Sequence, residues 1–264
     1  MVNAHGHFAW YELSTTDVEA AAAFYTKVVG WGARDASVPG RTYILFTAGE
    51  VLVGGLMGLP ESGIAAGKSC WIGYVGVEDA DDAAERVKRL GGTVHVPPTD
   101  IPNISRFAVF TDPQAATLGL LESFGPGQGH AAEMNAPGRV GWHELFAADW
   151  EKAFPFYGEV FGWQKAPTDV GEMNTYQLFS TEGRTIGGML TKPPMTPSPF
   201  WLYYFNVDNV DTAAQRVRAG GGQIVDGPLE VPDGSWVLLC KDPQGVIFAL
   251  EGKRSGPSTQ FFVG

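Results

Sequence analysis

Two glutamates lie in neighbourhoods suited to proton transfer. Glu12 belongs to the stretch HFAWYELSTTDVEAAAAFY and Glu144 to the similar stretch GRVGWHELFAADWEKAFPFY. Each stretch reads as a short strand that runs into an amphipathic helix. Alternate side chains of a strand share a face, so Trp10 faces the same way as Glu12, and Trp142 the same way as Glu144. A carboxylate among aromatic rings loses hydration, which raises its pKa towards a value useful for general acid–base catalysis.

A second strand in each half is expected to face these glutamates, in the segments WIGYVGV and WLYYFNV. The side chains predicted on that face are Ile72, Tyr74, Leu202 and Tyr204. Glu251, on the last strand, is predicted to point inward too, where its counterpart in the first half is Leu121. An apolar cavity with a few convergent polar groups is the usual form of a small-molecule site. A structural interpretation stays open, in which the glutamates are tied to inner strands and the aromatic rings only fill space.

An internal repeat in the sequence indicates which strands and helices position these residues. Residues in one half recur 130 to 133 positions later: Trp10, Asp17, Phe24, Tyr25, Gly30 and Trp31 as Trp142, Asp149, Phe156, Tyr157, Gly162 and Trp163. TYILF with Gly54-Gly55 returns as TYQLF with Gly187-Gly188, and Asp112-Pro113-Gln114 as Asp242-Pro243-Gln244. The repeat predicts a duplicated domain. We predict one domain over residues 1–124, a Gly- and Pro-rich linker over 125–138, and a second domain over 139–264 with a short C-terminal tail.

Each half divides again into two modules, each a strand, a helix and further strands. Thr16 and Glu19 have the spacing of a capping box, and Gly30 stands where a C-cap glycine would. Asn209 is the expected N-cap of the fourth helix. Pro155 removes one backbone hydrogen bond, which predicts a kink or a late start of the third helix. The glycine pairs after TYILF and TYQLF predict a bulge or a close backbone contact rather than a phosphate loop.

Four βαβββ modules, paired two by two, resemble the vicinal oxygen chelate superfamily of glyoxalase I, bleomycin-resistance proteins and extradiol dioxygenases. The resemblance covers nearly the whole chain. It rests on the strand that leads into a helix with Phe-Tyr and then Gly-Trp, and on the Asp-Pro-Gln turn before the last strand of each half. Within the superfamily the chain is most similar to two-domain proteins labelled hydroxylases of the glyoxalase family. The resemblance implies an α+β fold of two tandem domains, each a curled mixed sheet with its helices outside.

The resemblance also implies three metal-ligand positions in each domain, held by His or Gln, His, and Glu in the metal-dependent members. Aligned on the neighbouring motifs, these positions hold Trp10, Ile72 and Gly119 in the first half and Trp142, Leu202 and Ala249 in the second. None of these side chains can coordinate a cation. We therefore predict no metal at this site and no other cofactor, because no nucleotide fingerprint is present either.

The histidines do not replace the missing ligands. His5 and His7 lie in the N-terminal segment, His95 lies beside a proline pair, and His130 falls in the predicted linker. His143 follows Trp142 directly, so strand alternation turns it to the opposite face, where its counterpart Tyr11 is expected to face a helix. We interpret His143 as a packed, structural residue.

Composition narrows the classes of partner. The net charge of −11 disfavours binding to a nucleic-acid backbone, which needs a cationic face. No apolar run is long enough to span a bilayer, and no signal peptide is apparent, so we expect a cytoplasmic protein without a membrane partner. The two cysteines, Cys70 and Cys240, exclude a disulfide framework. The sequence is compatible with a monomer or a homodimer.

These observations favour a metal-independent superfamily member that binds a small apolar or aromatic metabolite on the inner face of a curled sheet. As an enzyme it would carry out lyase, isomerase or hydration-type steps, with Glu12 or Glu144 moving the proton. A hydroxylase would need a redox cofactor, for which no motif is visible. The alternative is a binding protein that sequesters a toxic or antibiotic-like compound without catalysis. A third possibility is a scaffold that only mediates interactions.

Overall fold

Each half of the chain forms one eight-stranded mixed sheet with two helices. The computed structural model describes residues 5–59, 68–125, 135–167 and 176–254. The first sheet comprises β1 (Phe8–Thr15), β2 (Gly32–Asp35), β3 (Tyr43–Ala48), β4 (Val51–Gly58), β5 (Cys70–Gly76), β6 (Thr93–Ile101), β7 (Ser105–Thr111) and β8 (Thr117–Ser123). Its helices are α1 (Val18–Val29) and α2 (Ala80–Arg89). The predicted linker falls largely outside the described residues, as do His130 and the tail after Arg254.

The second half repeats this arrangement. Its strands are β9 (Val140–Ala147), β10 (Gln164–Lys165), β11 (Tyr176–Thr181), β12 (Arg184–Thr191), β13 (Phe200–Asn209), β14 (Gln223–Glu230), β15 (Trp236–Lys241) and β16 (Ile247–Lys253). Its helices are α3 (Trp150–Phe161) and α4 (Val210–Ala219). The strand orders are β2-β3-β4-β1-β5-β8-β7-β6 and β10-β11-β12-β9-β13-β16-β15-β14, so the same topology occurs twice. The predicted α+β architecture of tandem modules is confirmed.

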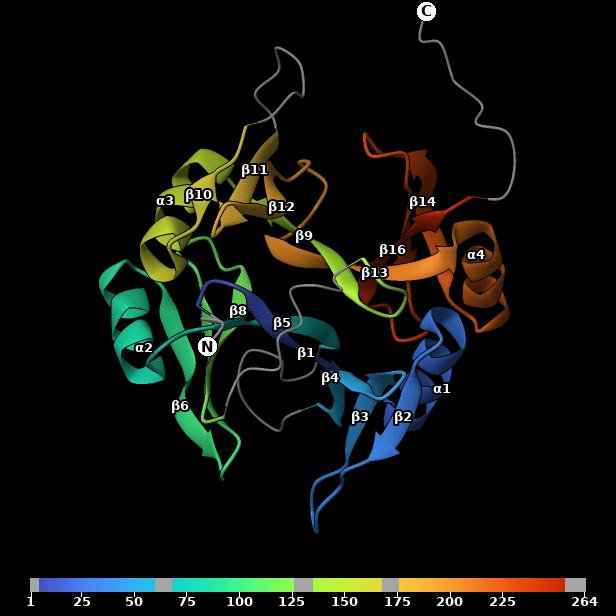
Figure 1. Ribbon diagram of the computed structural model, residues 1–264, viewed down its shortest axis with the longest axis horizontal. Coiled ribbons are helices and arrows are strands. Elements are labelled where there is room, and N and C mark those ends of the chain that lie inside the picture. The colour runs from blue at the N-terminus through green and yellow to red at the C-terminus, as the bar shows by residue number, and fades with distance from the viewer. Residues whose placement is uncertain (1–4, 60–67, 126–134, 168–175, 255–264) are drawn as a thin grey trace, which may run out of the picture.

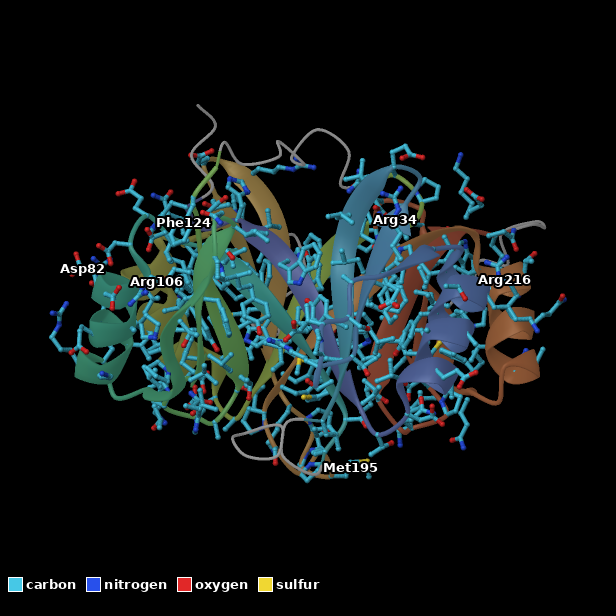
Figure 2. All side chains as sticks on the ribbon, turned by 90° about the horizontal axis from the view of Figure 1, so that it is seen from below. Arg34, Asp82, Arg106, Phe124, Met195 and Arg216 are labelled. Atoms are coloured by element: carbon cyan, nitrogen blue, oxygen red, sulfur yellow. The ribbon has the colours of Figure 1, made fainter. Side chains whose placement is uncertain are left out.

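Each sheet curls into a half-barrel, and the two half-barrels open in opposite directions (Figure 1). Their convex faces lie back to back, with β1 and β5 of the first sheet against β9 and β13 of the second. The helices cover the outside, where α1 lies beside α4 at one end of the molecule and α2 beside α3 at the other. Asp82 on α2 and Arg216 on α4 mark these two ends in Figure 2. Since the convex faces and the helices are packed together, the predicted site residues are expected on the concave faces.

Local signals in the sequence explain where the helices begin and end. The N-cap of α1 is Asp17, whose carboxylate accepts a hydrogen bond from the Ala20 amide at 2.9 Å. The predicted capping box at Thr16 is therefore wrong by one residue, because the better acceptor follows directly. Gly30 ends α1 in the left-handed conformation at φ 87°, as predicted. Asn209 caps α4 by accepting from the Thr212 amide, also as predicted.

Helix α3 tolerates its internal proline. The helix begins at Trp150, directly after its N-cap Asp149, and continues to Phe161 with Pro155 inside it. It has the same 12-residue length as α1, so the predicted late start is wrong. The N-terminal turn forms because the Asp149 carboxylate accepts from the Lys152 amide at 3.2 Å. The predicted kink stays a prediction.

One hydrophobic core joins the two halves, and residues that recur in the repeat make matched pairs of contacts across it. The Trp31 indole donates to the carbonyl of Gly138 at 2.7 Å, and the Trp163 indole donates to the carbonyl of Gly6 at 2.7 Å. Likewise the Tyr25 hydroxyl donates to Asp242 and the Tyr157 hydroxyl to Asp112, at 3.1 and 2.8 Å. Each Asp-Pro-Gln turn thus anchors a helix of the other half. Among the described residues, no helix is both long enough and apolar enough to cross a membrane.

Candidate active site

The strand registers bring most of the predicted site residues onto the two concave faces. In the first half Trp10 lies opposite Tyr74, and Glu12 lies opposite Ile72. In the second half β9 and β13 repeat these pairs, as Trp142 with Tyr204 and Glu144 with Leu202. Ile72 and Leu202 are buried, so they form part of the floor of each half-barrel.

Glu12 is held by two tyrosine hydroxyls from strands on either side of it. The Tyr43 hydroxyl, on β3, donates to one carboxylate oxygen at 2.8 Å. The Tyr74 hydroxyl, on β5, donates to the other at 3.2 Å. The Trp10 indole lies beside the Tyr43 hydroxyl and offsets part of the rise that burial causes in the pKa of Tyr43. Four side chains are thereby joined into a network that we call the first relay: Trp10, Tyr43, Glu12 and Tyr74.

The second half contains the same network with shorter bonds. Tyr176 and Tyr204 donate to the two oxygens of Glu144 at 2.7 and 2.8 Å. The Trp142 indole donates to the Tyr176 hydroxyl at 3.0 Å. We call this group the second relay. Its members come from β9, β11 and β13, the counterparts of β1, β3 and β5, so duplication has copied the whole arrangement.

The glycine pairs make room for these tyrosines. Gly55 pairs with Glu12 across β4 and β1, and a Cβ atom added to it would overlap the ring and hydroxyl of Tyr43. Gly188 has the same relation to Tyr176. A register shift also occurs beside Gly54, between Phe46 and Thr47. The prediction of a bulge or a close contact is confirmed, and the contact that matters is with a tyrosine of the relay.

Sequence reasoning missed Tyr43 and Tyr176, although a signal was present. Both tyrosines recur in the repeated segments TYILF and TYQLF, each on the strand that precedes the strand with the glycine pair. Alternation along β3 and its pairing with β4 would have placed Tyr43 on the face of Gly55, and hence of Glu12. The pairing of β4 with β1 is parallel and joins two strands that are separated in the chain by α1, β2 and β3. A pairing of this kind is hard to predict from one sequence.

Burial dominates the protonation chemistry of both relays. Loss of hydration raises the pKa of Glu12, and the hydrogen bonds from Tyr43 and Tyr74 offset this rise in part, as does the nearby Arg41. Burial raises the pKa of Glu144 as well, against the hydrogen bonds from its own two tyrosines. The pKa values of the four tyrosines lie above their ordinary range, first through burial and then through the adjacent carboxylate. The phenols therefore stay neutral donors, and the carboxyls are the groups that titrate.

The positions of the superfamily's metal ligands do not fit a divalent cation. Trp10, Ile72 and Gly119 offer no ligand atom, and neither do Trp142, Leu202 and Ala249. The Tyr74 ring lies over Gly119, in space that a Cβ atom there would need. Within the described ranges no three His, Cys, Asp or Glu side chains gather closely enough to hold an ion. Each glutamate already accepts hydrogen bonds on both oxygens, so the donor set suits a proton better than a metal.

Glu251 makes the two half-barrels differ. It is half-buried on β16, pairs with Val237, and accepts a hydrogen bond from the Ser235 hydroxyl at 2.7 Å. It lies close enough to Tyr204 to raise the pKa of that tyrosine. The predicted inward direction of Glu251 agrees with this position. It belongs to the rim beside Tyr204 and makes no direct bond to Glu144 among the hydrogen bonds described.

His143 is packed between the two halves, on the opposite side of β9 from Glu144. Its Nδ1 lies 2.7 Å from the carbonyl of Ile186, so that nitrogen carries the proton and Nε2 accepts from the Tyr11 hydroxyl at 2.6 Å. Burial lowers the pKa of His143 to about 3. The predicted structural role is confirmed. Tyr11 does not face a helix as predicted, because the convex faces of the two sheets meet there.

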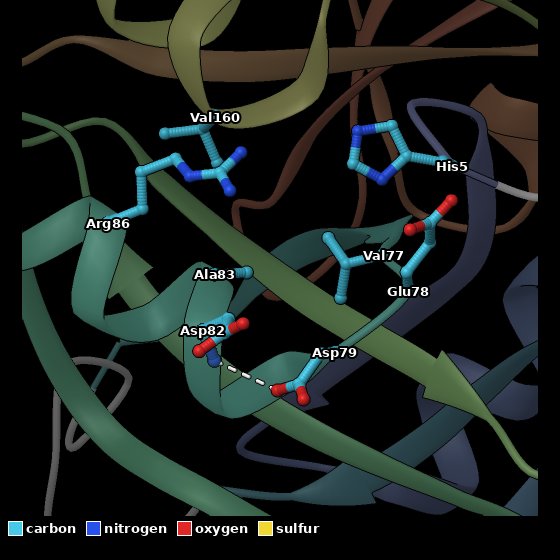
Figure 3. Close-up of a pocket in the computed structure, with 8 residues that line it drawn as sticks. All are labelled: His5, Val77, Glu78, Asp79, Asp82, Ala83, Arg86 and Val160. Carbon is cyan, nitrogen blue, oxygen red and sulfur yellow. Dashed lines mark hydrogen bonds between the residues drawn. The ribbon is translucent and has the colours of Figure 1, made fainter.

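A separate cavity of about 260 Å³ lies outside both half-barrels. Its lining includes His5, Glu78, Asp82 and Arg86, and Val160 of α3 closes it from the other half (Figure 3). None of the predicted site residues lines it. The Asp79 side chain there is occupied as the N-cap of α2, with its carboxylate accepting from the Asp82 amide at 2.9 Å.

The chain belongs to the Glyoxalase/Bleomycin resistance protein/Dioxygenase superfamily, whose sequence profile matches residues 6–118 and 138–250. A relative from Mycobacterium tuberculosis, named "Putative glyoxylase CFP32", is 32% identical over 91% of this chain and 92% of its own length. The anthracycline biosynthesis protein DnrV of Streptomyces peucetius is 31% identical over 96% of this chain and 95% of its own.

Solved structures share the fold at much lower identity. The Mn(II)-bound glyoxalase of Novosphingobium aromaticivorans superposes with a TM-score of 0.65 at 16% identity, over 95% of this chain and 83% of that one. The 2,3-dioxygenase LapB of Pseudomonas sp. KL28 gives a TM-score of 0.64 at 13% identity, over 99% and 97% of the two chains. The predicted superfamily and tandem fold are thus confirmed.

Proposed function

We propose that each half-barrel binds a small apolar or aromatic metabolite and that Glu12 and Glu144 move a proton in metal-independent acid–base chemistry. The observation that carries this proposal is the duplicated relay, in which a buried carboxyl with a raised pKa is flanked by two neutral phenols. A carboxyl whose pKa is raised by burial suits general acid–base catalysis.

The relay supplies both partners that a lyase, isomerase or hydration-type step needs. The carboxylate of Glu144 would take a proton from a carbon next to a carbonyl group of the substrate. Once Glu144 is protonated, its hydroxyl can donate to a tyrosine oxygen, and that tyrosine can turn its own proton to the substrate's oxygen. The electron pair left by the C–H bond moves to that oxygen, which the phenol then stabilises. Proton uptake and donation therefore balance within one network.

Relatives support an aromatic ligand. Two of them are named as anthracycline biosynthesis proteins, and anthracyclines are polycyclic aromatic compounds with carbonyl and hydroxyl groups. A ligand of that class would offer a flat apolar surface to Trp10 or Trp142 and an acidic proton to the glutamate. The name glyoxylase, attached to the mycobacterial relatives, agrees with carbonyl chemistry in general terms.

The second candidate function is sequestration without turnover. It is favoured by one observation, namely that both oxygens of each glutamate already accept tyrosine hydrogen bonds. In this case the relays are rigid structural elements of the site floor, and the aromatic residues alone hold the ligand. The chain would then act as a binding protein for a toxic or antibiotic-like compound.

Thermal-shift screening of the purified chain against a metabolite library, followed by product analysis, distinguishes these functions. A ligand that binds only the folded state raises the melting temperature. The variant Glu12→Gln/Glu144→Gln keeps the shape of the relays but cannot transfer the proton. Under the enzymatic proposal the variant still shifts with the ligand and forms no product. Equal conversion by the variant and the wild type would refute the proposal, and binding without conversion by either would establish sequestration.

A further inference from the structure

The charges around the two relays have diverged, although the relays themselves have not. In the first half Arg41 lies over the Tyr43 ring, with 5.6 Å from its guanidinium carbon to the ring centroid. The guanidinium also contacts the sulfur of Met57 at 3.8 Å. Tyr43 and Met57 are partners in the strand register, so Arg41 stands at the edge of the concave face.

A second cation lies at the same half-barrel. Lys68 is exposed two residues before the start of β5, and its charge acts on Cys70. The Cys70 side chain packs with Ile72 and Tyr74 on the concave face. Glu12 is also close enough to act on Cys70. The first relay therefore has one carboxyl and two cations near it.

The second half-barrel has the opposite balance. Glu251 lies beside Tyr204, and its carboxylate accepts from the Ser235 hydroxyl at 2.7 Å. The same hydroxyl lies 2.7 Å from the carboxylate of Asp233, so the two acidic residues share one serine. The second half-barrel thus has Glu144 within the relay, Glu251 beside Tyr204, and Asp233 beside Glu251.

The sequence repeat shows that each of these charges belongs to one half only. Arg41 precedes TYILF where Asn174 precedes TYQLF, and Lys68 corresponds to Ser198. In the other direction, Glu251 corresponds to Leu121 and Asp233 corresponds to Asn103. In these four differences the first half has the cations and the second half the acidic residues, while the relay residues are identical in type.

We infer that the two half-barrels select small aromatic ligands of opposite charge, the first an anion such as a carboxylate and the second a cation such as a primary amine. This inference rests on the proposed function, because it assumes that the concave faces bind such ligands. Electrostatic complementarity at a rim acts on specificity and encounter more than on total affinity. The two sites would therefore share a ring-binding floor and differ in the substituent that they accept.

Three probes with one skeleton test the inference on the full chain: 2-naphthoate, 2-naphthylmethylammonium and the neutral 2-naphthylmethanol. Binding is followed by the indole NMR signals of Trp10 and Trp142, assigned with Trp10→Phe and Trp142→Phe. We expect naphthoate to bind more tightly at Trp10 and the ammonium probe more tightly at Trp142. The neutral probe should bind both sites without a marked preference. Added salt should weaken both preferences, because Arg41, Lys68 and Asp233 are exposed.

Exchange of the rim residues between the halves provides the matched variants. Arg41→Asn/Lys68→Ser and Asp233→Asn/Glu251→Leu give each half the residues of the other. For exposed and half-buried charges at a rim we expect a roughly three- to tenfold weaker binding of the matching probe at the altered site and no change at the other. Charged probes without site preference, or variants without effect while the neutral probe still binds, would overturn the inference alone. Failure of all three probes to bind would overturn both the inference and the proposed function.

Discussion

At the scale of single residues, the protein places two carboxyls where water reaches them poorly and gives each the same two donors. Glu144 is 9% exposed, and among the described residues its charged form is stabilised by hydrogen bonds from Tyr176 and Tyr204. Burial costs the charged form more than these hydrogen bonds return, so the pKa is raised. The sequence allowed Glu12, Glu144 and their tryptophans to be predicted, because strand alternation alone defines that face.

The raised pKa of Glu144 predicts a definite pH dependence of stability. The folded state binds the proton more tightly than the unfolded chain, so the contribution of this group is full below its unfolded pKa of about 4.3 and is lost as the pH rises through the folded pKa. Glu144→Gln does not titrate. We expect its melting temperature, relative to wild type, to rise as the pH increases above about 4.3.

Thermal unfolding at a series of pH values measures this difference. The control is Glu230→Gln, at an exposed position on β14, for which the difference from wild type should change little. A difference for Glu144→Gln that stays flat or falls with pH would contradict the account of this carboxyl.

Removal of one tyrosine hydroxyl from the second relay should destabilise the folded protein, because it removes a hydrogen bond to the Glu144 carboxylate. Tyr176→Phe removes a hydrogen bond of 2.7 Å to Glu144 and the acceptor of the Trp142 indole. Hydrogen bonds to charged groups contribute about 1.5–3 kcal/mol, so we expect a loss of that order in the free energy of unfolding at neutral pH. Urea unfolding measures it. In the Glu144→Gln background the same change should cost less, and an equal cost would show that the bond to the carboxylate is not the cause.

At the scale of elements, β4 and β12 approach the relays closely because they carry glycine where other strands carry side chains. The Tyr176 ring packs directly on Gly188, and the Tyr43 ring packs directly on Gly55. The sequence predicted a close contact at the glycine pairs but not its partner. The partner depends on the parallel pairing of β4 with β1, a long-range contact that local patterns do not specify. The one-residue error at the cap of α1 has the opposite origin, because Thr16 and Asp17 are both good caps and their local competition decides.

Gly188→Ala should therefore displace Tyr176 from Glu144. The added methyl group overlaps the tyrosine ring, and overpacking of this kind costs about 1–3 kcal/mol. Gly58→Ala is the matched control, since its Cβ would meet only Val18 at 3.9 Å, and the backbone there is not left-handed. Urea unfolding and the indole signal of Trp142 report the two effects. Equal stability of the two variants, with an unchanged Trp142 signal, would refute the role of this glycine.

At the scale of the whole molecule, the two halves share one core rather than standing side by side as independent domains. The Asp-Pro-Gln turns bind helices of the other half, and Tyr11 donates to His143 where the two sheets meet. The duplication could be predicted from the repeat. The contacts between the halves could not be predicted, because each residue that makes them could equally well pack within its own half. Tyr11 is an example, since it was expected to face a helix.

This shared core predicts cooperative unfolding in a single transition. Tyr11→Phe leaves the buried Nε2 of His143 without its donor, which costs about 1–3 kcal/mol. We expect urea curves from circular dichroism and tryptophan fluorescence to coincide in the wild type and to move together in the variant. Two separated transitions, with only one of them moved by the substitution, would contradict a single cooperative core.

The central claim is that Glu12 and Glu144 are proton carriers on ligand-binding faces. A carbon-13 NMR titration of the glutamate carboxyls, with signals assigned by Glu12→Gln and Glu144→Gln, tests it most directly when repeated with bound 2-naphthylmethanol. We predict that both carboxyls titrate above the ordinary value of about 4.3 and that their midpoints move when the neutral ligand binds. Midpoints at or below that value, unaffected by the ligand, would contradict it.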